Sequence, residues 1–188
     1  MKNIEVVNQS KLLGTIITDK LTWYANTNYL VKKAYNRMQL LHKVASFTSS
    51  KEEKKTIYNS YIRSILEQSC VLWHSSLTID NSNDLERVQK AACKIILGNQ
   101  YSNYDQALYQ LSMDSLKIRR QKLSRKFAIK CLNNDKTFKL FPLNKKKHIM
   151  KTKKFEKFKI KFANTSRFKN SAIPQMQRLL NQEECRAF

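Results

Sequence analysis

The sequence predicts a mainly α protein with an N-terminal β-hairpin, a helical bundle and a basic C-terminal tail. Three observations carry this prediction. β-favouring residues dominate the first 18 positions, apolar residues then recur at helical spacing, and lysine dominates after "FPLN". We therefore divide the chain into residues 1–25, the hairpin, residues 26–141, the helical domain, and residues 142–188, the tail.

The first part, "IEVVNQSKLLGTIIT", holds two runs of β-favouring residues separated by "NQS". This pattern predicts an antiparallel hairpin with its turn at residues 8–10. Gly14, one of only two glycines in the chain, lies in the second run.

The first helix is predicted from Asn26 to about Phe47, because apolar residues recur there at helical spacing. Its expected buried positions are Leu30, Ala34, Met38, Leu41 and Ala45. The stretch "SKEE" then predicts a capping box, in which Ser50 and Glu53 satisfy each other's backbone donors.

The helix after this cap is expected to bury an apolar and aromatic stripe: Ile57, Tyr58, Tyr61, Ile62, Ile65 and Leu66. "CVLWHSSL" follows as a compact apolar corner around Trp73. A third helix should start near residues 81–83 and stop at Gly98. Its inward residues should be Leu85, Val88, Ala92 and Ile95.

Two further helices are predicted, a short one in "YDQALYQL" and a longer one in "SLKIRRQKLSRKFAIKCL". The longer helix should bury one apolar stripe: Leu116, Leu123, Phe127 and Cys131. Its other faces carry a set of cations: Arg119, Arg120, Lys122, Arg125, Lys126 and Lys130. In the tail, "FKIKF" alternates as a strand would, with a cationic polar face.

The charge of the chain points to an anionic partner. There are 36 Lys and Arg against 14 Asp and Glu, a formal net charge of +22. Such an excess repels itself unless an anion binds, and nucleic acid or an anionic membrane surface would serve. A genome rich in A and T would also raise the lysine content, but the excess is uneven: residues 145–188 hold 13 Lys and Arg against 3 acids.

The four cysteines are isolated, so neither a disulfide framework nor a zinc site is expected. No apolar run is long enough to span a membrane, and "MKNIEVVNQSK" lacks the apolar core of a signal peptide. We expect an intracellular, reduced protein.

Enzyme motifs are weak in this sequence. Two glycines cannot form a phosphate-binding loop of the Walker or dinucleotide type. Cys70 with His74 could form a dyad or half a metal site, and Asp80 with Asp84 could form a carboxylate pair. We favour plainer interpretations, namely a packed corner and a helix N-terminus that attracts acidic residues. No catalytic residue and no metal ligand is therefore assigned.

Two basic features are candidates for nucleic-acid binding, because Lys and Arg contact phosphates and aromatic rings stack on bases. The predicted contacts are Arg119, Arg120 and Arg125 on the long helix and Lys145, Lys146, Lys147, Lys153 and Lys154 in the tail. Two alternatives for the tail remain open: Phe155, Phe158 and Phe162 could pack on the domain, or the tail could be a disordered basic segment.

Five blocks occur in a notable order: "KLLGTIITDKLTW", "YNSYIRSILEQSCVLWHSSLT", "DLERVQKAACKIILG", "LSMDSLKIRRQKLSRKFAIKCLNN" and "RFKNSAIPQMQRLLN". They are spread along the chain from residue 11 to residue 181. Their order resembles the C-terminal part of reverse transcriptases from non-LTR (LINE-like) retrotransposons. The first block resembles the Leu-Gly hairpin of the primer grip, so Leu13 and Gly14 are the primer-grip-like residues. The second and third resemble a thumb helix and the Leu-Glu-x-x-Gln helix after it. The last two resemble an Arg-Arg helix and an Arg-x-x-x-Ser…Pro…Leu-x-Asn ending.

The resemblance implies a thumb-like helical domain that holds RNA, DNA or an RNA–DNA hybrid. The family's activity is RNA-directed DNA polymerisation, with Mg²⁺ bound by aspartates of the palm. No aromatic-Ala-Asp-Asp turn precedes the hairpin here, so we expect a truncated chain without the catalytic aspartates or their metal. Gln68 stands where the family often has an aromatic residue. Two alternatives remain open, a polymerase completed by a partner or upstream segment, and a decaying product without function.

Overall fold

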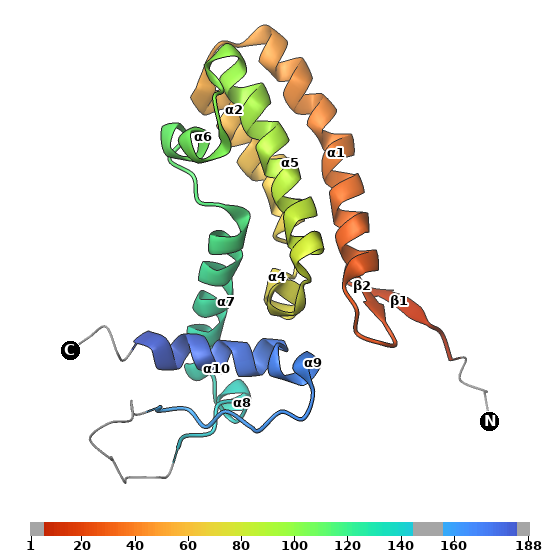
Figure 1. The fold of residues 1–188 in the computed structure, drawn as a ribbon, viewed down its shortest axis with the longest axis vertical. Helices are drawn as coiled ribbons and strands as arrows, with labels where there is room; N and C mark the ends of the chain where they lie inside the picture. The colour runs from red at the N-terminus through yellow and green to blue at the C-terminus, as the bar shows by residue number, and fades with distance from the viewer. Residues whose placement is uncertain (1–5, 145–155, 184–188) are drawn as a thin grey trace. The chain divides into compact units, whose positions relative to one another are not determined.

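The computed structural model describes residues 6–144 and 156–183 (Figure 1). It is mainly helical, with a two-stranded antiparallel hairpin at the N-terminal end, which confirms the predicted fold class. The chain forms two compact units. The first comprises the described residues up to Ser69 together with Leu77–Arg119, and the second comprises Cys70–Ser76 and the residues from Arg120 onward. These units divide the chain at other places than the predicted boundaries.

The hairpin pairs β1, Gln9–Leu12, with β2, Thr15–Thr18, in a register that sets Leu12 opposite Thr15. Leu13 and Gly14 form the turn, and both have positive φ, 48° and 83°. The turn expected at residues 8–10 is therefore wrong, whereas a hairpin that turns at the Leu-Gly pair of "KLLGTIITDKLTW" is what the structure has. Glycine adopts positive φ at little cost, so Gly14 rather than "NQS" marks the reversal.

Four helices build most of the first unit. They are α1, Tyr24–Phe47, α2, Lys51–Ile57, α5, Ile79–Leu97, and α6, Tyr104–Gln110. Helices α1 and α5 lie side by side along much of their length (Figure 1). The backbone amide of Ile16 in β2 donates to Oδ1 of the buried Asn26 at 3.0 Å, which attaches the hairpin to α1.

The helix after α2 is interrupted by a π-helical segment, Tyr58–Arg63, before the short α3, Ser64–Leu66. Such a segment shifts the phase of the buried face. Tyr58, Ile62, Ile65 and Leu66 are buried as predicted, whereas Tyr61 is exposed and stacks with Arg37, whose guanidinium carbon lies 4.1 Å from the ring centre.

Two predicted helix boundaries are confirmed in part. Ser50 accepts a hydrogen bond from the backbone amide of Glu53 at 3.3 Å, as a capping box requires. The Glu53 carboxylate does not return to Ser50 directly. It accepts from the hydroxyl of Thr48 at 2.6 Å, and the same hydroxyl oxygen accepts from the amide of Ser50 at 3.1 Å. Helix α5 starts at Ile79, before the predicted start, and ends at Gly98 as expected.

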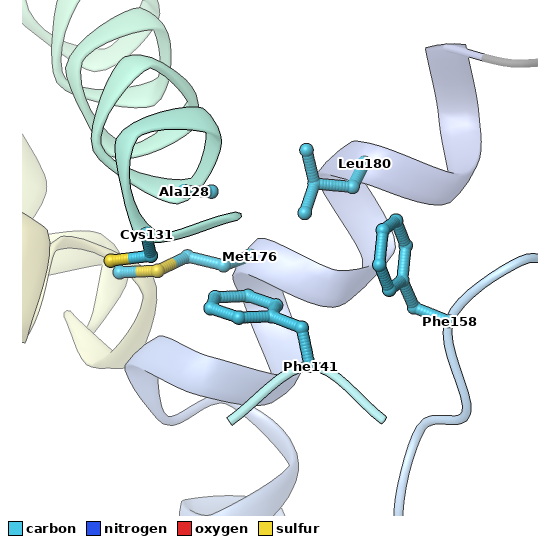
Figure 2. Close-up of a cluster of buried hydrophobic side chains, with 6 residues drawn as sticks. All are labelled: Ala128, Cys131, Phe141, Phe158, Met176 and Leu180. Carbon is cyan, nitrogen blue, oxygen red and sulfur yellow. The ribbon is translucent and has the colours of Figure 1, made fainter. Parts of the chain in front are cut away.

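The second unit contains α4, Cys70–Trp73, a 3₁₀ turn, His74–Ser76, and most of α7, Leu116–Leu132. Three more helices follow: α8, Asp135–Phe138, α9, Ser166–Lys169, and α10, Ala172–Glu183. Figure 2 shows the core of this unit, built from Ala128, Cys131, Phe141, Phe158, Met176 and Leu180. Phe141 and Phe158 meet edge to face, with ring centres 6.3 Å apart.

Two further expectations for this unit are wrong. "FKIKF" forms no regular strand, only an isolated bridge between Leu143 and Phe158. The buried stripe of α7 does not follow its apolar residues either. It runs through Leu116, Arg120, Ser124, Ala128 and Cys131, whereas Phe127 is exposed and Leu123 only partly buried. Burial of Arg120 and Ser124 rotates the inward face away from the apolar pattern.

Candidate nucleic-acid interface

The second unit carries most of the net charge. Cys70–Ser76 and Arg120–Phe188 hold 20 Lys and Arg against 4 Asp and Glu, whereas the rest of the chain holds 16 against 10. The second unit thus contributes +16 of the net +22, from well under half of the residues. The excess is concentrated in one part of the chain, which codon bias alone does not explain.

One helix presents these charges in a regular array. Lys122, Arg125, Lys126 and Lys130 are all exposed on α7, and we name them the α7 basic face. Three of them follow one another at every fourth position, which places them on one side of the helix about 6 Å apart along its axis. The opposite side of α7 faces the core through Ser124, Ala128 and Cys131.

The basic segment after residue 155 is anchored to the second unit. Asn181 in α10 binds the backbone of Phe158 twice: its Oδ1 accepts from the amide at 2.9 Å, and its Nδ2 donates to the carbonyl at 3.0 Å. The amide of Lys159 also donates to the carbonyl of Pro142 at 2.8 Å. The segment therefore holds its exposed cations, Lys157, Lys159 and Lys161, close to a fixed backbone.

Asn181 is the final residue of the Leu-x-Asn pattern in the last sequence block. The pattern was recognised in the sequence, but the hydrogen-bond partner of Asn181 could not be predicted, because Phe158 lies 23 residues earlier. Helix α9, which carries Arg167 and Lys169, is held in a similar way. Arg178 donates to the carbonyl of Lys169 at 2.6 Å, and Ser76 donates to the carbonyl of Asn170 at 2.8 Å.

Arg120 belongs to the core of the second unit. Its side chain has 0 % exposure, its guanidinium carbon lies 5.8 Å from the centre of the Trp73 ring, and its Nε donates to Nδ1 of His74 at 3.4 Å. A buried guanidinium cannot reach a phosphate from this position. The prediction that Arg120 contacts nucleic acid is therefore wrong for this structure.

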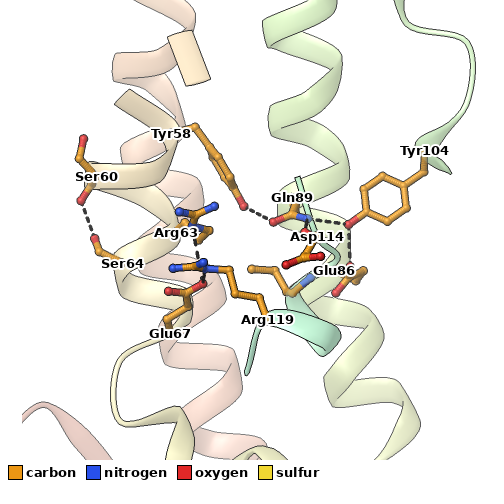
Figure 3. Close-up of polar contacts among 11 residues, drawn as sticks. Tyr58, Ser60, Arg63, Ser64, Glu67, Glu86, Gln89, Tyr104, Asp114 and Arg119 are labelled. Carbon is orange, nitrogen blue, oxygen red and sulfur yellow. Dashed lines mark hydrogen bonds and ion pairs between the residues drawn. The ribbon is translucent and has the colours of Figure 1, made fainter. Parts of the chain in front are cut away.

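Arg119 lies in a polar cluster of the first unit (Figure 3). Its Nε hydrogen-bonds to Oε1 of Glu67, and Nε of Arg63 lies 3.6 Å from the same oxygen. Burial, and then the neighbouring charge of Arg119, lowers the pKa of the Arg63 guanidinium. Glu67 offsets part of the repulsion between the two arginines. About a third of the Arg119 side chain stays exposed, so its contact with nucleic acid stays a prediction.

The Leu-Glu-x-x-Gln block supplies a buried hydrogen-bond network in the same unit. Gln89 links Tyr58 and Tyr104, and the Tyr104 hydroxyl donates to Oε1 of Glu86 at 2.6 Å (Figure 3). The same carboxylate oxygen accepts from the amide of Leu116 at 3.0 Å, where α7 begins. A carboxylate there complements the helix dipole. These contacts hold the first turn of α7, and they bring together no nucleophile with a base.

The other predicted residues fall into three groups. Arg125 is exposed on the α7 basic face. Lys145, Lys146, Lys147, Lys153 and Lys154 lie outside the described residues. The primer-grip-like pair forms the hairpin turn, where Leu13 is exposed and its carbonyl accepts from Nε2 of Gln68 at 3.1 Å.

The two residue pairs considered for chemistry stay unassigned. Cys70 is buried, and His74 is engaged by Arg120. Asp80 lies in the first turn of α5, and Asp84 pairs with Arg87 at 2.6 Å. Within residues 6–144 and 156–183, no group of three or more potential metal ligands occurs. No helix in this described part is both long and apolar enough to cross a membrane.

Comparison of the chain with protein-family models, curated proteins and solved structures finds no match. The resemblance to non-LTR reverse transcriptases therefore stays a prediction that depends on the five sequence blocks.

Proposed function

We propose that this chain binds nucleic acid through the second unit and is a non-catalytic C-terminal part of a reverse-transcriptase-like protein of the RNA-directed DNA polymerase family. One observation carries the proposal: the second unit concentrates +16 of the net charge and exposes the α7 basic face. A phosphate backbone is the anionic polymer that such an array fits, because it offers charges at regular intervals.

The rigid mounting of the cations supports this proposal. The α7 basic face belongs to a helix whose inner side is packed in the core, and the segment with Lys159 and Lys161 is pinned by Asn181. Cations carried on a fixed backbone require less loss of backbone entropy on binding than those of a free tail. Contacts to phosphates position a protein without reading base sequence. Binding should therefore tolerate many sequences.

Salt dependence tests the proposal directly. With about six phosphates neutralised, the logarithm of the association constant should fall against the logarithm of salt concentration with a slope near −5. Fluorescence anisotropy with a labelled oligonucleotide at several salt concentrations measures this slope. A flat response, or equal binding of an uncharged polymer, would contradict the proposal.

The non-catalytic part of the proposal can be tested independently of nucleic-acid binding. The 188 residues contain no aromatic-Ala-Asp-Asp sequence, and our proposal assigns polymerisation to other segments or to a partner. Primer extension by the isolated chain with Mg²⁺ or Mn²⁺ should yield no incorporation. Incorporation by the chain alone would overturn the non-catalytic assignment while leaving nucleic-acid binding intact.

A further inference from the structure

Phenylalanine is distributed as unevenly as charge. Eight of the nine phenylalanines belong to the second unit by sequence. Phe141 and Phe158 are in its core, but four others are exposed: Phe127, Phe138, Phe162 and Phe168. Each of these four lies directly beside a lysine or arginine in the sequence, as in "KF", "FK" or "RFK". Exposed aromatic rings thus alternate with cations over the described part of this unit.

Phe162 is the extreme member of this set, with 90 % of its surface exposed. It lies four residues after Phe158, whose ring is buried and whose backbone is pinned by Asn181. The chain between them carries the exposed Lys159 and Lys161. A large apolar ring is therefore presented to solvent from an anchored segment, flanked by positive charge.

Such an arrangement suits unpaired nucleotides. A base in a single strand has a free face that stacks on an aromatic ring, while nearby cations contact the adjacent phosphates. In a duplex the bases already stack on one another, and only the backbone and groove edges are accessible. Exposed rings would therefore add affinity for a single strand and little for a duplex.

A membrane surface fits these residues less well. Interfacial binding needs one continuous apolar face along an amphipathic helix. Helix α10 has such a face, but its residues Met176, Leu179 and Leu180 are buried in the second unit. The exposed rings lie instead on separate elements, Phe127 on α7, Phe138 on α8 and Phe168 on α9, with Phe162 outside any helix.

From these observations we propose that the second unit binds single-stranded nucleic acid, with Phe162 stacking on a base and Lys159 and Lys161 contacting the flanking phosphates. The inference rests on the proposed function, nucleic-acid binding, and specifies that the nucleic acid is single-stranded. It concerns the described residues alone and needs no contribution from residues 145–155.

The test compares Phe162→Ala with Phe47→Ala in the full chain. Phe47 is a matched control because it is 89 % exposed, ends α1 in the first unit and has no Lys or Arg directly beside it. Anisotropy is measured with a labelled single strand and with a duplex of the same length, over a salt series. Circular dichroism establishes that both variants fold, as expected for replacements at exposed positions.

We expect Phe162→Ala to weaken binding of the single strand about 5- to 150-fold, the range that loss of one stacked base produces. Its salt slope should not change, because phenylalanine carries no charge. Duplex affinity of Phe162→Ala, and both affinities of Phe47→Ala, should stay within about twofold of the parent protein.

Each other outcome has a distinct meaning. If the salt slope persists but Phe162→Ala binds the single strand normally, or if the parent protein prefers the duplex, the stacking inference is wrong and the proposed function stands. If neither nucleic acid binds in a salt-dependent way, the proposed function itself is wrong. Tighter binding to vesicles of anionic lipid than to the single strand, with loss of vesicle binding in Phe162→Ala, would assign the ring to a membrane surface and overturn the inference.

Discussion

Tyr58 donates a 2.7 Å hydrogen bond to Oε1 of Gln89 inside the first unit, and neither side chain reaches solvent (Figure 3). The amide nitrogen of Gln89 donates in turn to the hydroxyl of Tyr104 and to the carbonyl of Asp114, each at 3.0 Å. One amide group thus joins the π-helical segment, α5, α6 and the approach to α7. Burial raises the pKa of Tyr58 well above its usual value, because a phenolate there would lose its hydration.

Replacing Gln89 by leucine should strongly destabilise the first unit. Leucine leaves the buried Tyr58 and two partly buried groups, on Tyr104 and Asp114, without Gln89, so we expect the free energy of unfolding to fall by about 3 kcal/mol. Tyr58→Phe removes one hydrogen bond and should cost only about 1 kcal/mol. Urea denaturation measures both. Gln110→Leu, at an exposed position in α6, is the control and should lie within about 0.5 kcal/mol of the parent protein.

The helices were predictable because apolar spacing is a local property of the sequence. Leu30, Ala34, Met38 and Leu41 are buried in α1 as their periodicity indicates. The hairpin was predictable in kind but not in register, since the turn depends on the left-handed backbone at Leu13 and Gly14. Where helices need only an apolar stripe, turns need particular φ values at single residues.

The buried positions of polar residues could not be predicted from the sequence of this chain. Arg120 has the sequence character of a surface cation, yet Trp73 and His74, more than 40 residues earlier, enclose it. The same holds for Gln89, whose partners come from three other segments. Composition indicated a basic surface, but only the fold separates Arg125, which is exposed, from Arg120, which is buried.

The buried position of Arg120 predicts an effect on stability rather than on binding. Arg120→Lys keeps the charge but loses the planar group that lies over the Trp73 ring and donates to His74 through Nε. We expect the free energy of unfolding to fall by about 2–3 kcal/mol, with nucleic-acid affinity of the folded protein within about twofold. Arg125→Ala should instead weaken nucleic-acid binding and leave the free energy of unfolding nearly unchanged. Weaker binding by a stable Arg120→Lys protein would show that this side chain reaches the ligand.

The α7 basic face should account for a defined share of the salt dependence. The test replaces three of its lysines with alanine: Lys122, Lys126 and Lys130. Each phosphate contact removed should reduce the magnitude of the salt slope by about 1, so the triple variant should lose about 3. Alanine favours helix, so α7 itself should stay intact.

The matched control for this variant removes the same charge from the first unit. It replaces three exposed lysines of α1 and α5 with alanine: Lys32, Lys43 and Lys90. The slope should change by less than about 1 if the phosphates lie on the second unit. Equal losses in both triple variants would mean that net charge, and not the α7 basic face, governs binding.

The thiol of Cys93 should reduce stability in alkaline solution. Burial, and then the nearby Glu86, raises its pKa from 9.0 to about 12. Below pH of about 9 the thiol is protonated in both the folded and unfolded chains and has no effect. Above that pH the unfolded chain ionises first and binds fewer protons, so the free energy of unfolding falls by up to about 1.4 kcal/mol per pH unit until the folded pKa is reached.

Cys93→Ala isolates this contribution. The tyrosines with raised pKa values, Tyr58 and Tyr104, act in the same direction but are present in both proteins. Between pH 8 and pH 10, measured by urea denaturation, the parent protein should lose about 1.4 kcal/mol more than Cys93→Ala. Equal losses would mean that Cys93 titrates in the folded chain as it does in the unfolded one.

The hairpin turn offers a final test, because the two glycines of the chain differ in their surroundings. Both have positive φ, 83° at Gly14 and 54° at Gly98. A Cβ added at Gly14 would lie 2.2 Å from Nε2 of Gln68, whereas one at Gly98 would meet nothing within 4 Å. Gly98→Ala should cost about 2–3 kcal/mol of backbone strain, because φ 54° with ψ −126° lies outside the left-handed helical region and is nearly restricted to glycine. Gly14→Ala should cost about 2 kcal/mol, from backbone strain together with displacement of the amide that donates to Leu13.

A double variant separates these two costs at Gly14. Gln68→Ala removes the obstructing side chain, so Gly14→Ala should cost about 1 kcal/mol less in that background than in the parent protein. Thermal and urea denaturation of the four proteins of the cycle measure the coupling. Strict additivity of the two substitutions would show that Gln68 does not lie over the turn. The hydrogen bond from Gln68 to the carbonyl of Leu13 would then be absent.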